Sequence, residues 1–383
     1  MQSKKLIYLF TGKRGGFSHF IPIIKNFDNN KNINYKILVS DMHLSGKFGK
    51  TVNEIKLYSK NIIKLKKPIT GDGINKRLFT ISSTISEMGK IFSNKIPDYV
   101  ILLGDRAEVL GAAIASLHHN VPTIHLYGGD ITQGGTDEPT RHAISKLSSI
   151  HFVSNTKSYK NILQLGEEKW RIFNTGLISL DLFKKKDSEN KNSLLTKYGL
   201  DPKKPFLILI QHPVTWEINE TQKQINETLK ALKRVNFQKL AIYPCSDPGH
   251  EKIINSLKKE AKKSNFKLFK NIESKDFYSL LKFSDLLLGN SSCGITECGY
   301  FKKYVINIGS RQAGRLSGKN VFHVEHNSKK IEKLIKKILK KTKMKNIYSD
   351  YGNGNAMRTI NKVLKKNYSR INLIKKKFVE YKL

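Results

Sequence analysis

Carboxylates and glycines gather in a few short stretches of this 383-residue chain, and most of these stretches follow directly on an apolar run. The string GDRAE (104–108) places Asp105 behind the run YVILL and a glycine. In this position the carboxylate could act as a general acid or base. The alternative is that Asp105 caps the next helix, with Glu108 three residues later as in a capping box. Both roles suit one residue.

A second stretch, HLYGGDITQGGTDEPTRH (125–142), is rich in glycine and in charged side chains. A glycine-rich loop after a strand is a binding loop more often than a plain connection. Asp137 and Glu138 also suit the start of a helix around 139–147, so capping is the alternative for these two. Asp130 has no such alternative role, and Arg141 follows within the helix.

The first loop, TGKRGGFSHF (11–20), combines a tight turn with a helix predicted from about His19. Backbone N–H groups at a helix start favour an anion, and Arg14 adds a forked donor for phosphate. The glycines do not follow the pattern G-x-G-x-x-G, so a dinucleotide site is not supported. An ordinary strand-to-helix turn is the alternative.

Two stretches of the second half could bind a nucleotide. In QHPVT (211–215), His212 could protonate or polarise a sugar or phosphate oxygen, although a lone histidine is usually structural. The string GSRQAGRLSG (309–318) supplies Arg311 and Arg315, whose positive charges suit phosphate groups.

The stretch GNSSCGITECG (289–299) predicts a helix start that holds a diphosphate through exposed N–H groups. Ser291 and Ser292 can cap the helix, and Gly294 lets a ligand approach its first turn. The carboxylate of Glu297, one turn further, could accept both hydroxyls of a ribose. A serine nucleophile is the competing interpretation, and we discount it because the pattern G-x-S-x-G is not met.

Apolar runs alternate with amphipathic helical patterns, such as 75–94 and 106–118, through the whole chain. Alternation of this kind predicts parallel sheets built from βαβ units, and two such series predict two doubly wound, Rossmann-like α/β domains. The polar stretches above then lie at the carboxyl ends of strands, where such sheets bind ligands. The predicted strands are 5–10, 35–39, 99–103, 123–127 and 151–154, followed by 206–210, 239–243, 266–269, 286–289 and 304–308.

A charged stretch at 184–193 marks a boundary between domains near 175–200. We therefore expect domains at 1–177 and 178–354. The last segment, 355–383, is predicted to be helical and basic, and is expected to pack back on the first domain.

The composition is strongly basic, with 69 Lys and Arg against 31 Asp and Glu and a formal charge of +38. A nucleic-acid-binding protein would explain this charge. However, the excess is mostly lysine spread along the whole chain, and no recognition motif or aromatic–basic interleaving is found. We expect a solvated basic surface without a nucleic-acid partner, on which a positive cleft still attracts an anionic diphosphate.

The sequence predicts a cytoplasmic protein without a membrane partner. There is no run of 18 apolar residues, and the first apolar stretch is too short for a signal peptide. Cys245, Cys293 and Cys298 are odd in number and lack metal-ligand spacing, which indicates reduced thiols and no metal site.

Taken in order along nearly the whole chain, these strings resemble the hydrolysing UDP-N-acetylglucosamine 2-epimerases of the sialic and legionaminic acid pathway type. The resemblance implies the glycosyltransferase-B fold, in which two Rossmann-like domains face each other across a cleft that holds the substrate. The matching strings are GDRAE, HLYGGD, DEPTRHAISKLSSIHFVS, LQLGEEKWRIFNTG, QHPVT, YPCSDPG, GNSSCGITE and NIGSRQAGRLSG.

The resemblance implies that UDP-N-acetylglucosamine and water are converted to UDP and N-acetylmannosamine, without metal or redox cofactor. The carboxylates that transfer protons in the N-terminal domain are matched by Asp105, Asp130 and Asp137. The resemblance does not assign which of them is the acid and which is the base. His212 matches the histidine near the leaving diphosphate. The nucleotide-binding set is implied to be Ser291, Ser292, Gly294, Glu297, Arg311 and Arg315, with Phe277 or Tyr278 near the base. A homodimer is common in enzymes of this resemblance.

Two positions depart from the family pattern. Gly16 stands where an acidic residue is usual, and Tyr127 stands where histidine or glutamate is usual. Both are expected near the sugar, so UDP-N,N′-diacetylbacillosamine is the alternative substrate. The strings HxEAGLRT and HRREN of the non-hydrolysing branch are absent. A glycosyltransferase and a non-catalytic sugar-nucleotide-binding protein are further alternatives.

Overall fold

The computed structural model describes residues 4–65, 73–183, 190–341, 344 and 349–381. The chain divides into two compact units. Unit 1 comprises Met1–Ile131, Asp137–Lys185 and Tyr351–Leu383, and unit 2 comprises Thr132–Thr136 and Lys186–Asp350. Most of the charged stretch predicted to mark the domain boundary, residues 184–189, lies outside the described residues.

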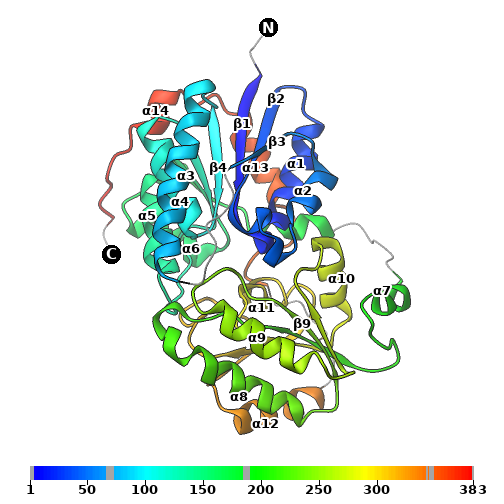
Figure 1. Cartoon of the computed structure of the whole chain (residues 1–383). Coiled ribbons are helices and arrows are strands. Elements are labelled where there is room, and N and C mark those ends of the chain that lie inside the picture. The colour runs from blue at the N-terminus through cyan, green and yellow to red at the C-terminus, as the bar shows by residue number, and fades with distance from the viewer. Residues whose placement is uncertain (1–3, 66–72, 184–189, 342–343, 345–348, 382–383) are drawn as a thin grey trace. The chain divides into compact units, whose positions relative to one another are not determined.

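Unit 1 is built on a parallel sheet of seven strands, in the order β3-β2-β1-β4-β5-β6-β7. The strands are β1 (Lys5–Thr11), β2 (Ile33–Val39), β3 (Ile62–Lys64), β4 (Tyr99–Leu103), β5 (Thr123–Leu126), β6 (Ile150–Val153) and β7 (Ile172–Asn174). The helices are α1 (Phe20–Asp28), α2 (Val52–Tyr58), α3 (Asn75–Asn94), α4 (Ala107–His118), α5 (Asp137–Leu147), α6 (Thr156–Gln164), α13 (Ala356–Lys365) and α14 (Arg370–Ile374). Helices α3 and α4 lie side by side (Figure 1).

Unit 2 repeats this plan with a parallel sheet of six strands, in the order β10-β9-β8-β11-β12-β13. The strands are β8 (Phe206–Ile210), β9 (Gln238–Ile242), β10 (Phe266–Phe269), β11 (Leu286–Gly289), β12 (Tyr304–Ile308) and β13 (Val321–Val324). The helices are α7 (Lys191–Lys197), α8 (Thr221–Lys233), α9 (His250–Glu260), α10 (Ser274–Phe283), α11 (Ser292–Thr296) and α12 (Ser328–Leu339). The predicted fold class, two Rossmann-like parallel-sheet α/β domains, is confirmed.

The central strands form because their side chains are apolar on both faces. All five residues of β8, FLILI, are buried, as expected for a parallel strand covered by helices on each side. Helices α8, α9 and α12 supply the apolar side chains that pack on the sheet of unit 2. The predicted strands fall within two residues of the observed ones. The short edge strands β3, β7 and β13 were missed because they carry no long buried run.

Short 3₁₀ helices occupy several of the connections between these strands and helices. In unit 1 they are η1 (Arg14–His19), η2 (Asp41–Leu44), η3 (Gly46–Phe48), η4 (Lys169–Arg171) and η5 (Ile178–Phe183), and in unit 2 η6 (Thr215–Glu220). None of the helices in the described part of the chain combines the length and the apolarity that a membrane span requires.

The C-terminal segment packs on unit 1. Helix α13 contacts α1 and η5 (Figure 1). Asp181 of η5 accepts hydrogen bonds from the first two backbone N–H groups of α13, at 2.9 Å each. The buried guanidinium of Arg171 donates to the carbonyls of Asn372, Leu373 and Lys375, each at 2.9 Å. Polar contacts therefore hold both α13 and α14 against this unit.

Candidate active site

A buried arginine connects the carboxylate of one predicted catalytic aspartate to the backbone of another. Arg141, on α5, is 1% exposed. It donates through Nε and Nη2 to one carboxylate oxygen of Asp105, with the Nε bond at 3.1 Å. Its Nη1 donates to the backbone carbonyl of Asp130 at 2.6 Å. The structure thus brings together residues that follow β4 and β5 with a residue of the next helix.

Asp130 is 3% exposed, and several donors hold the Oδ1 atom of its carboxylate. Oδ1 accepts hydrogen bonds from the hydroxyls of Ser154, at 2.9 Å, and of Ser158, and a longer one from the amide of Asn155. These three donors follow β6 or begin α6, so they fix the plane of the carboxylate from the neighbouring strand. They lie in SNTKS (154–158), and none of the three was among the predicted site residues.

Asp137 begins α5 and lies one turn before Arg141, on the same face of the helix. Its carboxylate is 3.9 Å from the guanidinium of Arg77 on α3, and both side chains are about a quarter exposed. Glu138 lies 3.5 Å from His142. Both acids stand in the first turn of α5, so the expectation that they begin this helix is met. Asp137 is more exposed than Asp105 or Asp130.

His125, in β5, positions the loop before Asp105. Its Nε2 is 2.7 Å from the carbonyl of Gly104, and its Nδ1 is 3.1 Å from the hydroxyl of Ser145. Because a carbonyl only accepts, Nε2 carries the proton. Burial lowers the pKa of His125 to about 3, so the ring is neutral. Gly104 has φ +80°, a conformation that glycine adopts without strain.

The capping interpretation of GDRAE is wrong. Arg106, and not Asp105, stands at the N-cap of α4, and it makes no side-chain cap hydrogen bond. Glu108 does not form a capping box with Asp105. Its carboxylate accepts a hydrogen bond from Nε of Arg106 at 3.2 Å. Asp105 instead accepts hydrogen bonds from Arg141.

The first loop forms η1 before α1 begins at Phe20, close to the predicted helix start. Arg14 is 8% exposed, and its guanidinium lies 6.0 Å from the centre of the Phe48 ring. A side chain on Gly16 would meet Leu103, because a Cβ there would lie 2.8 Å from a leucine methyl. An acidic side chain at position 16 would therefore collide with Leu103 at the end of β4, and glycine avoids this collision.

The other departure, Tyr127, has a structural explanation. Its hydroxyl is 2.9 Å from Nδ1 of His19 and accepts a hydrogen bond from the backbone N–H of Ile178, also at 2.9 Å. Burial lowers the pKa of His19 to about 3, so its neutral ring can accept from the hydroxyl. Tyr127 therefore ties the loop after β5 to η1 and η5. Its hydroxyl does not need a sugar as a partner.

In unit 2, His212 is buried at the carboxyl end of β8. Its Nδ1 accepts a hydrogen bond from the backbone N–H of Cys245 at 3.1 Å, so the proton of a neutral ring lies on Nε2. The side chain of Asn290 accepts from the N–H of His212 at 2.7 Å and donates to its carbonyl at 2.9 Å. His212 is therefore fixed by the loops that follow β9 and β11.

Glu297 and Tyr278 meet in unit 2. The hydroxyl of Tyr278 donates to Oε1 of Glu297 at 2.5 Å, and both side chains are at most 5% exposed. Phe277, the neighbour of Tyr278, is half-buried, and the two rings meet edge to face at 5.4 Å. The structure thus joins the residue predicted for the ribose to one of the two predicted near the base.

The helix start after β11 differs from the prediction in two details. Ser291 is at the N-cap of α11 but makes no side-chain cap hydrogen bond, and Ser292 is the first helical residue. A Cβ at Gly294 would lie 2.9 Å from Val305 and 3.1 Å from Leu287. The glycine therefore lets α11 pack closely on β11 and β12, which explains it without a ligand.

Arg311 and Arg315 belong to the turn after β12. Arg311 donates to the carbonyl of Asn290 at 3.1 Å, and Arg315 donates to the side chain of Gln312 at 2.9 Å. The segment 132–136 packs against the same turn. A Cβ on Gly134 would lie only 2.2 Å from the Cα of Arg311, so no side chain fits there.

No grouping of His, Cys, Asp and Glu side chains suited to a metal ion occurs among the residues that the structure describes. Cys245, Cys293 and Cys298 are buried and form no disulfide bond among the described residues. The polar groups gathered after the strands are carboxylates, an imidazole and guanidinium groups. Such a set can transfer protons and stabilise negative charge.

The sequence matches the family described as UDP-N-acetylglucosamine 2-epimerase over residues 25–365. A curated relative from Legionella pneumophila, named UDP-N,N′-diacetylbacillosamine 2-epimerase (hydrolyzing), is 34% identical over 94% of this chain and 96% of its own length. The chain belongs to the UDP-N-acetylglucosamine 2-epimerase family. The predicted resemblance is confirmed, and the chain is an enzyme of this kind.

Two further comparisons bear on substrate and fold. The UDP-N-acetylglucosamine 2-epimerase of Neisseria meningitidis serogroup B is 30% identical over 85% of each chain. A solved UDP-GlcNAc 2-epimerase from Neisseria meningitidis, bound to UDP-GlcNAc, superposes with a TM-score of 0.77 at 20% identity, over 95% of this chain and 100% of that one. At this identity the structural match shows the fold alone.

Proposed function

We propose that the protein is a hydrolysing UDP-sugar 2-epimerase. It converts a UDP-linked 2-acetamido sugar and water to UDP and the free sugar with the opposite configuration at C2. The observation that carries the proposal is the cluster of Asp105, Arg141 and Asp130, in a chain similar over 94% of its length to a relative named as hydrolysing.

The reaction has two stages. A carboxylate removes the proton from C2, the electron pair forms a C1–C2 double bond, and the bond from C1 to the diphosphate oxygen breaks. UDP and a glycal result. Water then adds its oxygen to C1, and C2 receives a proton on the opposite face. The C2 proton is weakly acidic, so the step needs positioned carboxylates and stabilisation of the departing negative charge.

Unit 1 supplies the proton-transfer groups in this proposal. Asp105, Asp130 and Asp137 are the candidates, and two of them are fixed through Arg141. Asp105 and Asp137 have side chains about a fifth to a quarter exposed, so a substrate can reach them without displacing core contacts. Arg14 and Glu138 are assigned to substrate binding.

Unit 2 binds the nucleotide in this proposal. The Nε2–H of His212 can donate to an oxygen of the leaving diphosphate, because Nδ1 is engaged by Cys245. Glu297 accepts the ribose hydroxyls, with Phe277 and Tyr278 beside the base. The remaining assigned residues are Ser291, Ser292, Gly294, Arg311 and Arg315, of which the two arginines offset the negative charge of the diphosphate.

Two sugars are candidates. Relatives named for UDP-N,N′-diacetylbacillosamine are 34% and 33% identical, and one from Campylobacter jejuni is named for the GDP- and UDP-linked forms. The relative named for UDP-N-acetylglucosamine is 30% identical over 85% of this chain. We therefore place UDP-N,N′-diacetylbacillosamine first. UDP-N-acetylglucosamine, which would give N-acetylmannosamine, comes second.

The proposal requires neither metal nor redox cofactor. It places the enzyme in the cytoplasm, where its three cysteines stay reduced. A homodimer is part of the proposal, and the molar mass in solution tests it. If the protein is a monomer at the concentration used for activity measurements, the proposed dimer is wrong, whereas the proposed reaction is not affected.

The deciding experiment incubates the protein with each UDP-sugar in deuterated water. The expected products are UDP and a free sugar that carries one solvent deuterium at C2, because the proton removed is replaced from solvent. Magnetic resonance of the sugar and chromatography of UDP give the readouts. If neither UDP-sugar releases UDP, or if C2 keeps its hydrogen and configuration, the proposal is wrong.

A further inference from the structure

A polar cavity lies at the amino-terminal end of the unit 1 sheet. Its volume is about 620 Å³, which falls within the range of about 300–1,000 Å³ that is usual for small-molecule sites. The walls come from the starts of β1, β2 and β4, from the end of α1 and from the second half of α13. All of these elements belong to unit 1, so the cavity is complete within this unit.

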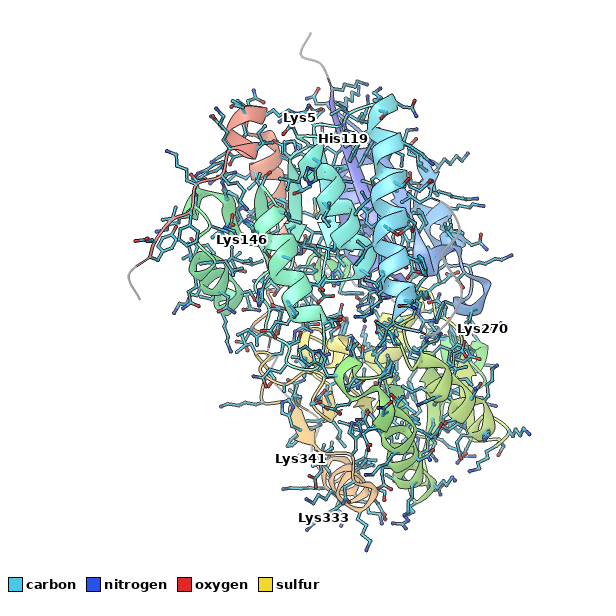
Figure 2. All side chains as sticks on the ribbon, turned by 60° about the vertical axis from the view of Figure 1, so that its left-hand side comes forward. Lys5, His119, Lys146, Lys270, Lys333 and Lys341 are labelled. Atoms are coloured by element: carbon cyan, nitrogen blue, oxygen red, sulfur yellow. The ribbon has the colours of Figure 1, made fainter. Side chains whose placement is uncertain are left out.

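The cavity and the candidate catalytic residues of unit 1 use opposite ends of the same strands. Asp98 lines the cavity just before β4, whereas Asp105 follows the strand, and five residues of strand span about 17 Å. Lys5, which also lines the cavity, begins β1 (Figure 2). The proposed reaction uses the carboxyl ends of the strands and needs nothing from this cavity. A ligand bound here would therefore be additional to the UDP-sugar.

Asparagine dominates the lining of the cavity. Six of its eleven lining residues are asparagines, whereas the whole chain has 31 asparagines among 383 residues. The composition of the chain would place only about one asparagine in a set of this size. The six are Asn26, Asn29, Asn30, Asn32, Asn361 and Asn367. The amide groups therefore mark this cavity chemically.

Two of these amides are half-buried and without a protein partner. Asn26 belongs to α1 and Asn361 to α13, and these two helices contact each other. Neither side-chain amide forms a hydrogen bond with any other residue that the structure describes. Polar groups in such positions are normally satisfied by protein, water or a ligand. An amide supplies two N–H donors and a carbonyl acceptor, which suits hydroxyl groups, because a hydroxyl both donates and accepts.

The charged side chains of the cavity wall offset one another. The ammonium of Lys5 donates to the carbonyls of Leu364 and Lys366 at the end of α13, at 2.8 and 3.1 Å. Asp98 accepts a hydrogen bond from the N–H of Leu6 at 2.7 Å. Burial lowers the pKa of Lys5, and the neighbouring Asp98 acts in the opposite direction. The wall therefore presents little net charge to a ligand.

The helix ends at the cavity disfavour an anion. Both α1 and α13 end there, and the last carbonyls of a helix carry a partial negative charge. Lys365 is exposed, so solvent ions screen its positive charge. Ile33 and Leu364 add an apolar area to the wall, which suits the C–H face of a sugar ring or a methyl group.

We propose that this cavity binds an uncharged, hydroxyl-rich molecule of the size of a mono- or disaccharide. The amides of Asn26 and Asn361 pair with its hydroxyl groups. A free sugar and the end of a glycan chain share this chemistry. The inference does not rest on the proposed function, because no reacting group belongs to the cavity.

The test measures dissociation constants by saturation-transfer magnetic resonance in wild type, Asn26→Ala and Asn361→Ala. The probes are N-acetylglucosamine and its β-linked dimer. Both positions are helical, and alanine has the higher helix propensity, so the two variants should fold. Each variant should weaken binding by about three- to tenfold, as expected for the loss of an uncharged hydrogen bond. Tighter binding of the monomer indicates a free sugar, and tighter binding of the dimer indicates a glycan end.

Asn53→Ala on α2 is the matched control. Asn53 is an exposed helical asparagine outside the cavity, and its variant should bind both sugars as wild type does. Asn361→Trp should abolish binding, because its ring would occupy part of the cavity, and circular dichroism shows whether this variant folds. If wild type binds neither sugar, or if a folded Asn361→Trp and the two alanine variants bind as tightly as wild type, the cavity is not a sugar site. Tighter binding of N-acetylglucosamine 6-phosphate that is lost in the alanine variants would overturn the preference for an uncharged ligand.

Asp105→Asn separates the cavity from the candidate active site. Asp105 lies at the other end of β4, so this variant should bind the sugars with the wild-type dissociation constant, whatever its rate of UDP release. A loss of binding in Asp105→Asn but not in the two alanine variants would place the sugar at the candidate active site, and the cavity proposal would fail. Failure of the epimerase proposal would leave these binding measurements unaffected.

Discussion

Arg141 organises the catalytic candidates at the scale of single residues. Its guanidinium satisfies one oxygen of Asp105 twice and the backbone of Asp130 once. Such a buried cation has little freedom, so it holds the two loops at a fixed spacing. Breaking a buried pair on one side is costly because the other charge is left without a partner. A change at Arg141 would therefore affect folding as well as activity.

Asp105→Asn tests the chemistry with less structural damage than a change at Arg141, because the amide oxygen can still accept a hydrogen bond from the guanidinium. We expect kcat to fall by about 10²–10⁴-fold, as for loss of a general acid or base, with little change in affinity for UDP. Initial rates of UDP release and calorimetric titration with UDP give the two quantities.

Asp98→Asn is the matched control for this variant. Asp98 precedes β4 at the opposite end of the same strand and accepts a hydrogen bond from the N–H of Leu6. The Asp98→Asn variant should release UDP at the wild-type rate. If Asp105→Asn keeps more than a tenth of the wild-type kcat, then Asp105 does not transfer the proton.

At the scale of elements, the C-terminal segment is held to unit 1 by a buried cation. Lys376 donates to the carbonyls of Lys146 and Ser148 at 2.7 Å, and its ammonium is 2.8 Å from the buried Glu167. Burial lowers the pKa of Lys376 to about 8, although Glu167 acts in the opposite direction. Arg171 adds its contacts to the end of α14. The segment thus supplies donors for backbone carbonyls of α5 and of the connection between α5 and β6.

Lys376→Met should lower the free energy of unfolding of unit 1 by roughly 1–3 kcal/mol, because two carbonyls and Glu167 lose a buried partner. Urea unfolding followed by circular dichroism measures this difference. Lys377→Met, at an exposed neighbouring position, is the control and should stay within about 0.5 kcal/mol of wild type. Equal midpoints for the two variants would show that the contact of Lys376 adds nothing to stability.

At the scale of the whole molecule, the positive charge is distributed over many elements. Figure 2 labels lysines on β1, on α5, after β10, on α12 and after α12, which belong to both units. Many of the ion pairs are short-range pairs on helix surfaces, such as Lys336 with Glu332. A charge spread in this way favours solubility and attraction of anions in general, and it does not mark a nucleic-acid site.

Three buried neutral histidines make unit 1 sensitive to acid. Burial lowers the pKa of His19, His43 and His125 to about 3, whereas an unfolded histidine titrates near 6.5. Between these values the unfolded chain takes up protons that the folded chain does not. The stabilisation is therefore complete above pH 6.5 and is lost as the pH falls toward 3.

We expect the free energy of unfolding to drop between pH 7.5 and pH 5 by up to about 2 kcal/mol for each of these histidines. Urea midpoints at the two pH values measure the drop. His125→Asn should be less stable at pH 7.5 but show a shallower dependence, whereas the exposed His118→Gln should follow wild type. A midpoint that does not change with pH would contradict the assignment of neutral rings.

Much of the fold could be predicted from the sequence, because buried parallel strands leave a local signal. The runs YVILL and FLILI coincide with β4 and β8, and their order along the chain predicts two doubly wound units. The edge strands β3 and β7 escaped because three residues, partly exposed, carry no such run. The motifs after the strands were likewise found by type and spacing alone.

The sequence by itself determined the class of fold, the family and the set of candidate residues, since each depends on local pattern and on order along the chain. The tertiary structure alone decided which side chains meet. Arg141 joins Asp105 across 36 positions, and Arg106 turns from its neighbour toward Asp41. It also showed that Gly294 makes room for Val305 and that Tyr127 bonds His19. Such pairings form only when the strands align in the sheet, because this alignment brings side chains that are distant in sequence within hydrogen-bond distance of one another.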